Sequence, residues 1–260
     1  MRALIRRVAF TWAVVEGFSN EQINRAGATI RAYFNGEFGD VRFDDGTETS
    51  RKVDEAFEVM VAFRAAHQRP LIVATNGLRS TVRTQKCQDL EVSQRLKRGI
   101  TIVNKLGREP KMLLSRMQDI AGCRAVLASI DEVRRVQTQL MRRRGYLTFK
   151  DYIVDPKSTG YRGIHVILRY NDCRVEVQLR TKVMHEWAIT QELLGPQTGI
   201  DLKSGEAPPI VKEYFRDISE AMAVDERGEI IPEELLRTLQ ERRDEVFSIL
   251  RRSQEELKNG

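Results

Sequence analysis

At 260 residues, the chain is long enough for one large domain or for a core domain with helical additions. Its 41% hydrophobic and 31% charged residues are typical of a globular protein and exclude an intrinsically disordered one. The net charge of +6 favours anionic partners such as nucleotides, RNA or acidic proteins, and it does not select among them.

The three cysteines, Cys87, Cys123 and Cys173, form no CxxC pair, so neither a disulfide framework nor a zinc site is predicted. A reducing, cytoplasmic setting is the simplest interpretation. No apolar run reaches the length of a membrane span. The segment 1–17 is only loosely similar to a secretion signal, because no cleavage site follows it, and we expect it to pack into the core.

Two amphipathic helices are predicted in the N-terminal part. Ser19 and Gln22 form a capping-box pattern, and apolar residues follow them at helical spacing. Ser50 is expected to open the second helix. Between the two, the segment 36–50 has the glycine and aspartate content of a loop, whereas 70–92 shows no clear period.

Helices and strands are predicted to alternate in the middle of the chain. Helical spacing recurs over 100–106, a buried strand is expected over 120–127, and Ser129 with Glu132 caps a helix that ends near Gly145. Three further strands are predicted over 146–154, 163–170 and 174–180, with a tight turn between the last two.

The C-terminal part is predicted to be helical, with a Gly/Pro-rich loop before Pro209. The helices are expected over 183–194, 209–222 and 232–257. An apolar stripe on the last one would pack on its own domain or support a homo-oligomer.

Together these elements predict an α+β fold, in which helices flank a mixed, mostly antiparallel sheet between residues 120 and 180. We expect three regions along the chain: an N-terminal helical region over 1–80, a core over 81–200, and C-terminal helices over 201–260.

Polar side chains alternate along the strand predicted over 174–180. Four of them share one face: Arg174, Glu176, Gln178 and Arg180. A solvated outer face would give the same pattern. Two other predicted strands also carry polar groups at or near their beginnings, namely Asp119, Arg124, Tyr161, Arg162 and His165.

If these strands share a sheet, Asp119 and Glu176 are expected to meet as two carboxylates among cationic groups. Magnesium bound to phosphates needs one or two such oxygen ligands, since it keeps much of its water. One carboxylate is also suited to accept the proton of an attacking hydroxyl.

A second basic cluster lies in the segment RLKRGITIVNKL. Arg95 and Lys97 share one side of an extended segment, and Lys105 lies two helical turns beyond Lys97. The cluster is typical either of a solvated helix face or of a triphosphate site in which arginine stacks on a purine. The chain has no Walker loop and no kinase glycine loop, so the familiar ATP-binding folds are not predicted.

Four segments together resemble the RelA/SpoT synthetase domain in their order and spacing: RLKRGITIVNKL, QDIAGCR, DYIVDPKSTGYRGIH, and VEVQLRT followed by MHEWA. The resemblance covers about 95–188 and implies a small single-domain synthetase with a nucleotidyltransferase-like fold. That family transfers the β,γ-pyrophosphate of ATP to the ribose 3′-hydroxyl of GDP or GTP. The transfer makes ppGpp or pppGpp, uses Mg²⁺ and releases AMP.

The resemblance implies a role for each motif on the ATP side. Arg95 and Arg124 are expected to hold the adenine between their guanidinium planes. Lys97 and Lys105 are expected to bind the ATP phosphates. The magnesium ligands, and the catalytic pair, are then Asp119 and Glu176, with Glu176 as the base that activates the 3′-hydroxyl.

On the acceptor side, the resemblance implies that Tyr161 stacks on the base and that Gln178 lines the pocket. Three residues are expected to hold the acceptor phosphates and to fix the loop: Lys157, Arg162 and His165. For His185 and Trp187, packing of a helix against the sheet and a contact with the ligand are both open.

Because of one departure from the family pattern, the sequence does not determine the identity of the acceptor. After Trp187-Ala188 the family usually continues with Glu-His and then Tyr-Lys, whereas this chain has Gln191-Glu192 and no Tyr-Lys. The alternatives are a toxic synthetase, with an antitoxin as partner, that makes adenosine alarmones or pyrophosphorylates the 3′ end of tRNA, and a non-enzymatic nucleotide- or RNA-binding module. Arg-rich patches such as 142–144 fit the tRNA alternative, and they fit a solvated helix face equally.

Overall fold

A computed structural model describes residues 17–39, 45–88, 91–200 and 207–259 of the chain. The expectation that 1–17 packs into the core therefore falls almost wholly outside the described residues.

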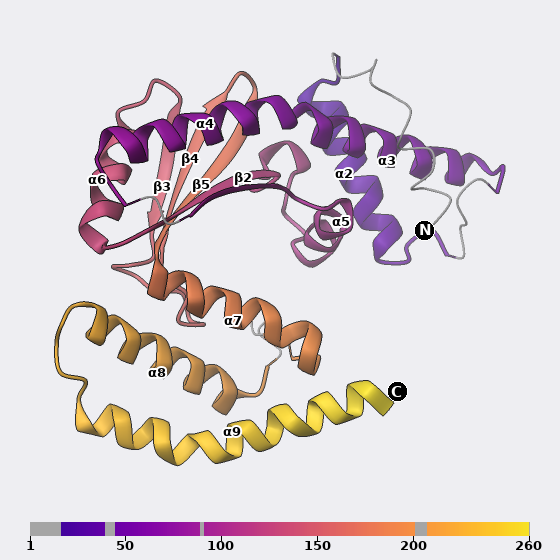
Figure 1. Ribbon diagram of the computed structural model, residues 1–260. Helices are drawn as coiled ribbons and strands as arrows, with labels where there is room; N and C mark the ends of the chain where they lie inside the picture. Colours follow the sequence, from indigo (N-terminus) through magenta and orange to yellow (C-terminus); the bar gives the residue numbers. More distant parts are fainter. Residues whose placement is uncertain (1–16, 40–44, 89–90, 201–206, 260) are drawn as a thin grey trace.

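A five-stranded sheet lies at the centre of the molecule (Figure 1). Its strands are β1 (Glu91–Leu96), β2 (Ala121–Leu127), β3 (Tyr146–Asp151), β4 (Ile164–Tyr170) and β5 (Cys173–Thr181). They are ordered β1-β2-β5-β4-β3, and β2 pairs with β5 in parallel while the other neighbours are antiparallel. The predicted mixed, mostly antiparallel sheet is confirmed.

Helices cover both faces of this sheet. In chain order they are α2 (Asn20–Phe34), α3 (Glu48–Ala66), α4 (Gln68–Thr84), α5 (Gly99–Arg108), α6 (Ile130–Met141), α7 (Lys182–Thr198), α8 (Pro209–Glu226) and α9 (Glu233–Asn259), with a 3₁₀ turn, η2 (Leu114–Arg116). In Figure 1, α4 runs along one side of the sheet, whereas α7 lies on the other side with α8 and α9 beyond it.

The main core lies between the sheet and the helices α4 and α6. Val175, Val177 and Leu179 alternate along β5, are fully buried, and pack with Leu78 of α4 and Val136 of α6. Burying each such side chain contributes about 1.5–3 kcal/mol. The alternation consequently turns the polar residues of β5 toward the opposite face, where the candidate site lies.

A second core joins α2, α3, α5 and η2 at one end of the sheet. The predicted capping box of α2 is present, because the Ser19 side chain accepts a hydrogen bond from the main chain of Gln22 and the Gln22 side chain accepts one from that of Ser19. The helix expected to open at Ser50 begins earlier, at Glu48, because the Thr47 side chain caps it by accepting from the Ser50 N–H.

The segment 70–92, which has no clear period in the sequence, contains most of helix α4. This helix follows α3 after a single residue, His67, whose Nδ1 lies 2.8 Å from the Phe63 carbonyl oxygen. The regional boundary expected at residue 80 falls inside α4, where Leu78 and Val82 both pack against the sheet.

The three C-terminal helices form a third core. Val246 of α9 is fully buried, and Leu239 and Leu250 pack beside it against α7 and α8. Part of the apolar stripe therefore packs on its own chain, whereas Leu236 and Phe247 are exposed, and an oligomer contact through α9 stays a prediction. Helix α7 runs past the predicted end through Pro196 to Thr198. Among the described helices, none combines the length and apolar character needed to span a membrane.

Candidate active site

The register of the sheet brings the chemically interesting side chains into two rows on one face. Opposed residues of neighbouring strands point to the same side. One row across the sheet consists of Arg95, Gly122, Glu176, Ile167 and Thr148. The next consists of Ser93, Arg124, Gln178, His165 and Lys150.

A cavity of about 640 Å³ opens over these rows, and α7 closes one of its walls. This volume is that of a site for a nucleotide-sized ligand. Among the described residues that line it, seven are lysine or arginine and three are acidic. The cavity is therefore strongly cationic, which suits a ligand with several phosphates.

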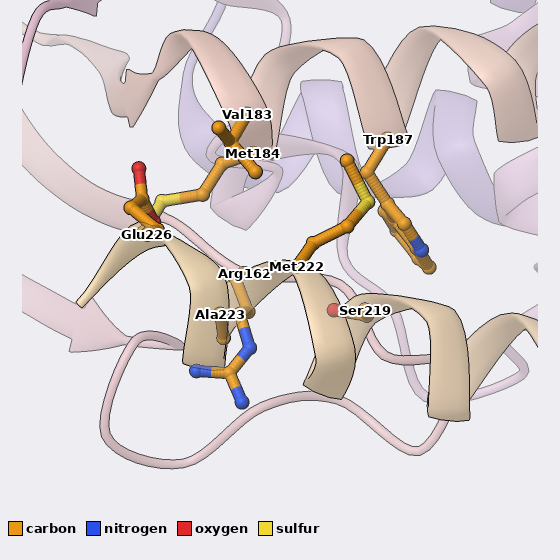
Figure 2. A pocket seen from close by; sticks show the side chains of 8 residues that line it. All are labelled: Arg162, Val183, Met184, Trp187, Ser219, Met222, Ala223 and Glu226. Atoms are coloured by element: carbon orange, nitrogen blue, oxygen red, sulfur yellow. The ribbon is translucent and has the colours of Figure 1, made fainter. Parts of the chain in front are cut away.

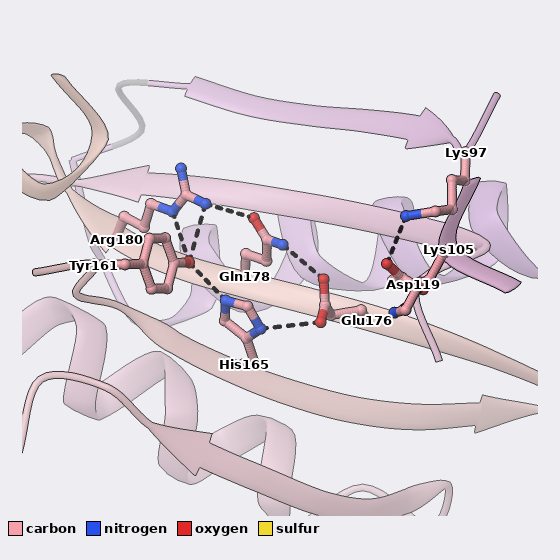
Figure 3. A network of polar contacts seen from close by, with 8 residues as sticks. All are labelled: Lys97, Lys105, Asp119, Tyr161, His165, Glu176, Gln178 and Arg180. Carbon is pink, nitrogen blue, oxygen red and sulfur yellow. Dashed lines mark hydrogen bonds and ion pairs between the residues drawn. The ribbon is translucent and has the colours of Figure 1, made fainter. Parts of the chain in front are cut away.

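Asp119 lies just before β2, between two lysines. Lys97 Nζ is 2.7 Å from Asp119 Oδ2, and Lys105 Nζ is 3.1 Å from Oδ1 (Figure 3). Burial by itself would raise the pKa of Asp119, but the hydrogen bonds and charges of the two lysines hold that pKa below its usual value. The three side chains thus form a compact charged group at one end of the cavity.

Glu176 lies at the centre of the sheet and has a partner for each oxygen. His165 Nδ1 is 2.9 Å from Oε1, and the Gln178 amide donates to Oε2 over 2.6 Å. Burial tends to raise the pKa of Glu176, yet the contacts with His165 and Gln178 outweigh it and leave the pKa lowered. Glu176 is consequently ionised at neutral pH.

A chain of hydrogen bonds runs from Arg180 through Tyr161 and His165 to Glu176 (Figure 3). Arg180 donates to the Tyr161 hydroxyl from Nε at 3.2 Å and from Nη2 at 3.0 Å. The Tyr161 hydroxyl lies 2.6 Å from His165 Nε2. With the proton on Nδ1, His165 accepts from Tyr161 and donates to Glu176, which satisfies every contact. The network fixes the orientation of the Glu176 carboxylate.

The structure brings the two predicted metal ligands to the same cavity. Asp119 and Glu176 both line it, and the charge of Asp119 raises the pKa of Glu176, opposing the effect of His165 and Gln178. Two carboxylates that repel each other within one cavity form a donor set that suits a divalent cation. Within the described part of the chain, no group of three or more His, Cys, Asp or Glu side chains is arranged to hold a metal. The remaining ligands of such an ion would be water and phosphate oxygens.

The four cations predicted for the ATP side also line the cavity, namely Arg95, Lys97, Lys105 and Arg124. Arg95 is exposed, and Arg124 donates from Nη2 to Glu91 Oε1 over 2.8 Å. The Nε atom of Arg124 is buried and has no hydrogen-bond partner. Arg95 and Arg124 project from neighbouring strands toward the same space.

On the predicted acceptor side, Lys157, Tyr161, His165 and Gln178 line the cavity. The Lys157 Nζ atom lies 4.7 Å from the ring centroid of Tyr152 and 4.9 Å from that of Tyr161. A cation near the aromatic rings marks this end as suited to a ligand that combines a base with phosphates.

One of the predicted acceptor residues, Arg162, lies away from the cavity. Arg162 is not among the described residues of this cavity and lies instead against α7 and α8 (Figure 2), with Nη1 donating to the Ile153 carbonyl over 3.3 Å. Both ring nitrogens of His165, which does line the cavity, have protein partners, one of them Glu176, and its contact with the acceptor phosphates stays a prediction. His185 and Trp187 of α7, for which helix packing and ligand contact were both open, differ in their surroundings. His185 is buried and packs beside Glu91, whereas Trp187 donates to the Phe215 carbonyl and also borders the cavity.

Sequence reasoning missed several side chains that line the cavity. Arg180 shares the alternation of Glu176 along β5, so its pattern contained the signal, whereas Lys150 and Tyr152 depend on the β3–β4 register. Gln191 and Glu192, the pair that departs from the family pattern, both line the α7 wall. Gln191 is buried, and its Nε2 atom has no partner.

The fold and the site define a class of protein: an α+β chain whose mixed sheet carries a cationic, carboxylate-containing cavity that is suited to a phosphorylated ligand. The family described as "Region found in RelA / SpoT proteins" matches residues 94–192, from β1 into α7. The chain is 31% identical over 157 residues to GTP pyrophosphokinase YjbM of Bacillus subtilis, covering 54% of this chain and 72% of that protein.

Solved structures agree with this match. Small alarmone synthetase 1 of Bacillus subtilis bound to its product pppGpp aligns with a TM-score of 0.52 and 27% identity, over 64% of this chain and 90% of that one. A second structure of that synthetase aligns with a TM-score of 0.52 and 26% identity, over 67% and 94%. The chain belongs to the RelA/SpoT family, as a small synthetase of that family.

Proposed function

We propose that the protein transfers the β,γ-pyrophosphate of ATP to the ribose 3′-hydroxyl of GDP or GTP, making ppGpp or pppGpp and releasing AMP. The observation that carries this proposal is the ionised Glu176, held by two hydrogen bonds on the floor of a cationic cavity. Family membership supports a pyrophosphotransferase, and pppGpp is the product bound to a relative of known structure.

Glu176 is proposed as the general base. A carboxylate has about four lone-pair positions, and the protein uses two of them here, so the acceptor's 3′-hydroxyl has room to donate its proton. The 3′-oxygen then bonds to the β-phosphorus while the bond from that phosphorus to the α,β-bridging oxygen breaks. AMP departs with that electron pair, and Glu176 holds the hydroxyl proton.

Asp119 and Glu176 are proposed to hold a magnesium ion, whose charge would offset that of the transferring phosphates. Lys97 and Lys105 add positive charge beside Asp119, which supports a role for them in binding the ATP phosphates. Arg95 and Arg124 project toward the same space, and their planar guanidinium groups are suited to stack on the adenine.

The acceptor is proposed to bind at the Lys157–Tyr161 end. Tyr161 would stack on the guanine, since it lines the cavity and the network fixes its hydroxyl. Gln178 borders the same space, and Lys157 supplies charge for the acceptor phosphates.

A parallel acceptor assay tests the proposal. Purified protein, Mg²⁺ and ATP labelled on the γ-phosphate are offered GDP, GTP, ATP or deacylated tRNA in separate reactions. We expect label on GDP and GTP, with one AMP released for each transfer, and loss of transfer when EDTA removes the metal. Label on tRNA or ATP with none on the guanine nucleotides would contradict the proposed acceptor and favour the toxic alternatives.

Tyr161→Ala is expected to raise the KM for GTP about tenfold or more, because stacking on an aromatic ring contributes about 1–3 kcal/mol per base. The dissociation constant for ATP should change little. Tyr161→Phe is the matched control, since it keeps the ring and removes the hydroxyl that contacts His165 and Arg180. Equal losses for ATP and GTP in a binding titration of Tyr161→Ala would show that the loop does not belong to the acceptor side.

A further inference from the structure

Helix α8 packs against the far side of the loop that carries Tyr161. Three consecutive residues of this loop alternate in direction. Tyr161 lines the large cavity, whereas Gly160 and Arg162 on either side of it contact α8 or the space between α7 and α8 (Figure 2). The main chain of the loop therefore lies between the acceptor end of the cavity and α8.

At Gly160, the main chain of the loop lies directly against α8. Ser219 of α8 donates from Oγ to the Gly160 carbonyl over 2.5 Å, and this hydrogen bond is buried. A Cβ at Gly160 would lie 3.0 Å from both Arg216 Cα and Ser219 Cβ, and 3.2 Å from Trp187 Cζ2. Gly160 also has a φ of +85°, which favours glycine. The loop can approach α8 this closely only because residue 160 has no side chain.

The contact at Arg162 joins the loop to the same helix. Its side chain enters a small void of about 10 Å³ between α7 and α8, beside Met184, Met222 and Glu226. Burial raises the pKa of Glu226, and the positive charge of Arg162 acts in the opposite direction, so the two groups attract each other. Arg162 also donates to Ile153 near the other end of the loop. This arginine thus ties both ends of the loop together beside α8.

Helix α8 is itself held firmly. The Trp187 indole of α7 donates to the Phe215 carbonyl over 3.1 Å. On the other side, Arg242 of α9 donates to Asp217, which is almost fully buried. A helix fixed by both neighbours provides a rigid support for the loop.

We propose that α8 is a positioning element for the acceptor, acting through Ser219 on Gly160 to hold Tyr161 at the angle needed for stacking. Helix α8 lies outside the segment 94–192 that matches the family. The inference rests on the proposed function of the cavity, and it assigns to a C-terminal helix of this chain a part in acceptor binding.

Ser219→Ala tests this proposal. We expect the KM for GTP to rise about three- to tenfold, the loss typical of one buried hydrogen bond, with the KM for ATP nearly unchanged and the melting temperature lowered by a few degrees. The matched control is Thr190→Ala on α7. It also removes a helix hydroxyl, but this one is exposed and bonds to Glu186 of its own helix. A rise in the KM for GTP no larger in Ser219→Ala than in Thr190→Ala would overturn the proposal.

A double-mutant cycle tests whether Ser219 acts through Tyr161. In a Tyr161→Ala background, Ser219→Ala should have no further effect on the KM for GTP, because there is no ring left to position. Additive losses would mean that α8 stabilises the fold without positioning Tyr161, which contradicts the proposal.

Limited trypsin digestion separates failure of this inference from failure of the proposed function. Lys157 is an exposed cleavage site in the loop. We expect faster cleavage after Lys157 in Ser219→Ala than in wild type or Thr190→Ala, whatever acceptor the enzyme uses. Wild-type protein that makes no (p)ppGpp would refute the proposed function alone. Unchanged cleavage in Ser219→Ala would refute the positioning role alone.

Discussion

Glu176→Gln is expected to lower kcat for pyrophosphate transfer about a thousandfold, within the 10²–10⁴ range for loss of a positioned general base. Glutamine has the same shape but cannot take the proton of the 3′-hydroxyl. The lowered pKa of Glu176 means that the carboxylate is already ionised at neutral pH, so its contribution to the rate should disappear only as the pH falls through that low value. Steady-state rates with GTP measure the loss of kcat. A titration of ATP binding shows separately whether the variant still binds ATP.

The control for this variant is Glu186→Gln, an exposed glutamate on α7 with a distant ion pair to Lys182. It makes the same chemical change away from the cavity, and it should leave the rate within twofold of wild type. Circular dichroism should show both variants folded. Turnover near the wild-type rate in Glu176→Gln would show that another group takes the proton.

Alternation along a strand was enough to predict which side chains of β5 share a face. Glu176, Gln178 and Arg180 differ by two positions, and side chains in a strand return to the same face every second residue. The alternation could not reveal which residues of the neighbouring strands lie beside these side chains. The parallel pairing of β2 with β5 joins segments more than fifty residues apart, and it is this pairing that places Gly122 next to Glu176.

The loop before β4 shows why the position of Arg162 could not be predicted from the sequence. Arg162 turns away from the cavity because Gly160 and Arg162 pack on α8, a helix that begins almost fifty residues later. His165 contacts Tyr161 and Glu176, and both contacts are made through tertiary structure. Contacts of this kind depend on the assembled fold, and local residue spacing does not contain them.

Helix α4 was not predicted because its sequence has features that usually oppose a helix. Gly77 lies in its middle, where glycine costs about 1 kcal/mol relative to alanine. A Cβ at this position would lie 2.6 Å from Arg143 Nη1, and Arg143 donates to the Gly77 carbonyl over 2.8 Å. The glycine thus admits a long-range contact from beyond α6, and packing against the sheet compensates for its low helix propensity.

Asp119→Asn is the other variant with a large expected effect. We expect kcat to fall about a hundredfold or more, and the Mg²⁺ concentration for half-maximal rate to rise about tenfold, because a neutral amide is a far weaker ligand for a hard cation than a carboxylate. The same change removes the negative charge between Lys97 and Lys105. Both lysines then become fully available to phosphates, so ATP binding measured without Mg²⁺ should be equal to wild type or tighter.

These opposite effects distinguish two roles for Asp119. If it holds the metal, the Mg²⁺ requirement rises while metal-free ATP binding is kept. If it only spaces the two lysines, the Mg²⁺ requirement stays at the wild-type value and ATP affinity alone changes. Asp244→Asn on α9 serves as the control, since its carboxylate is exposed, lies outside the cavity and pairs with the neighbouring Arg243. An unchanged Mg²⁺ titration in Asp119→Asn would refute the site formed by Asp119 and Glu176.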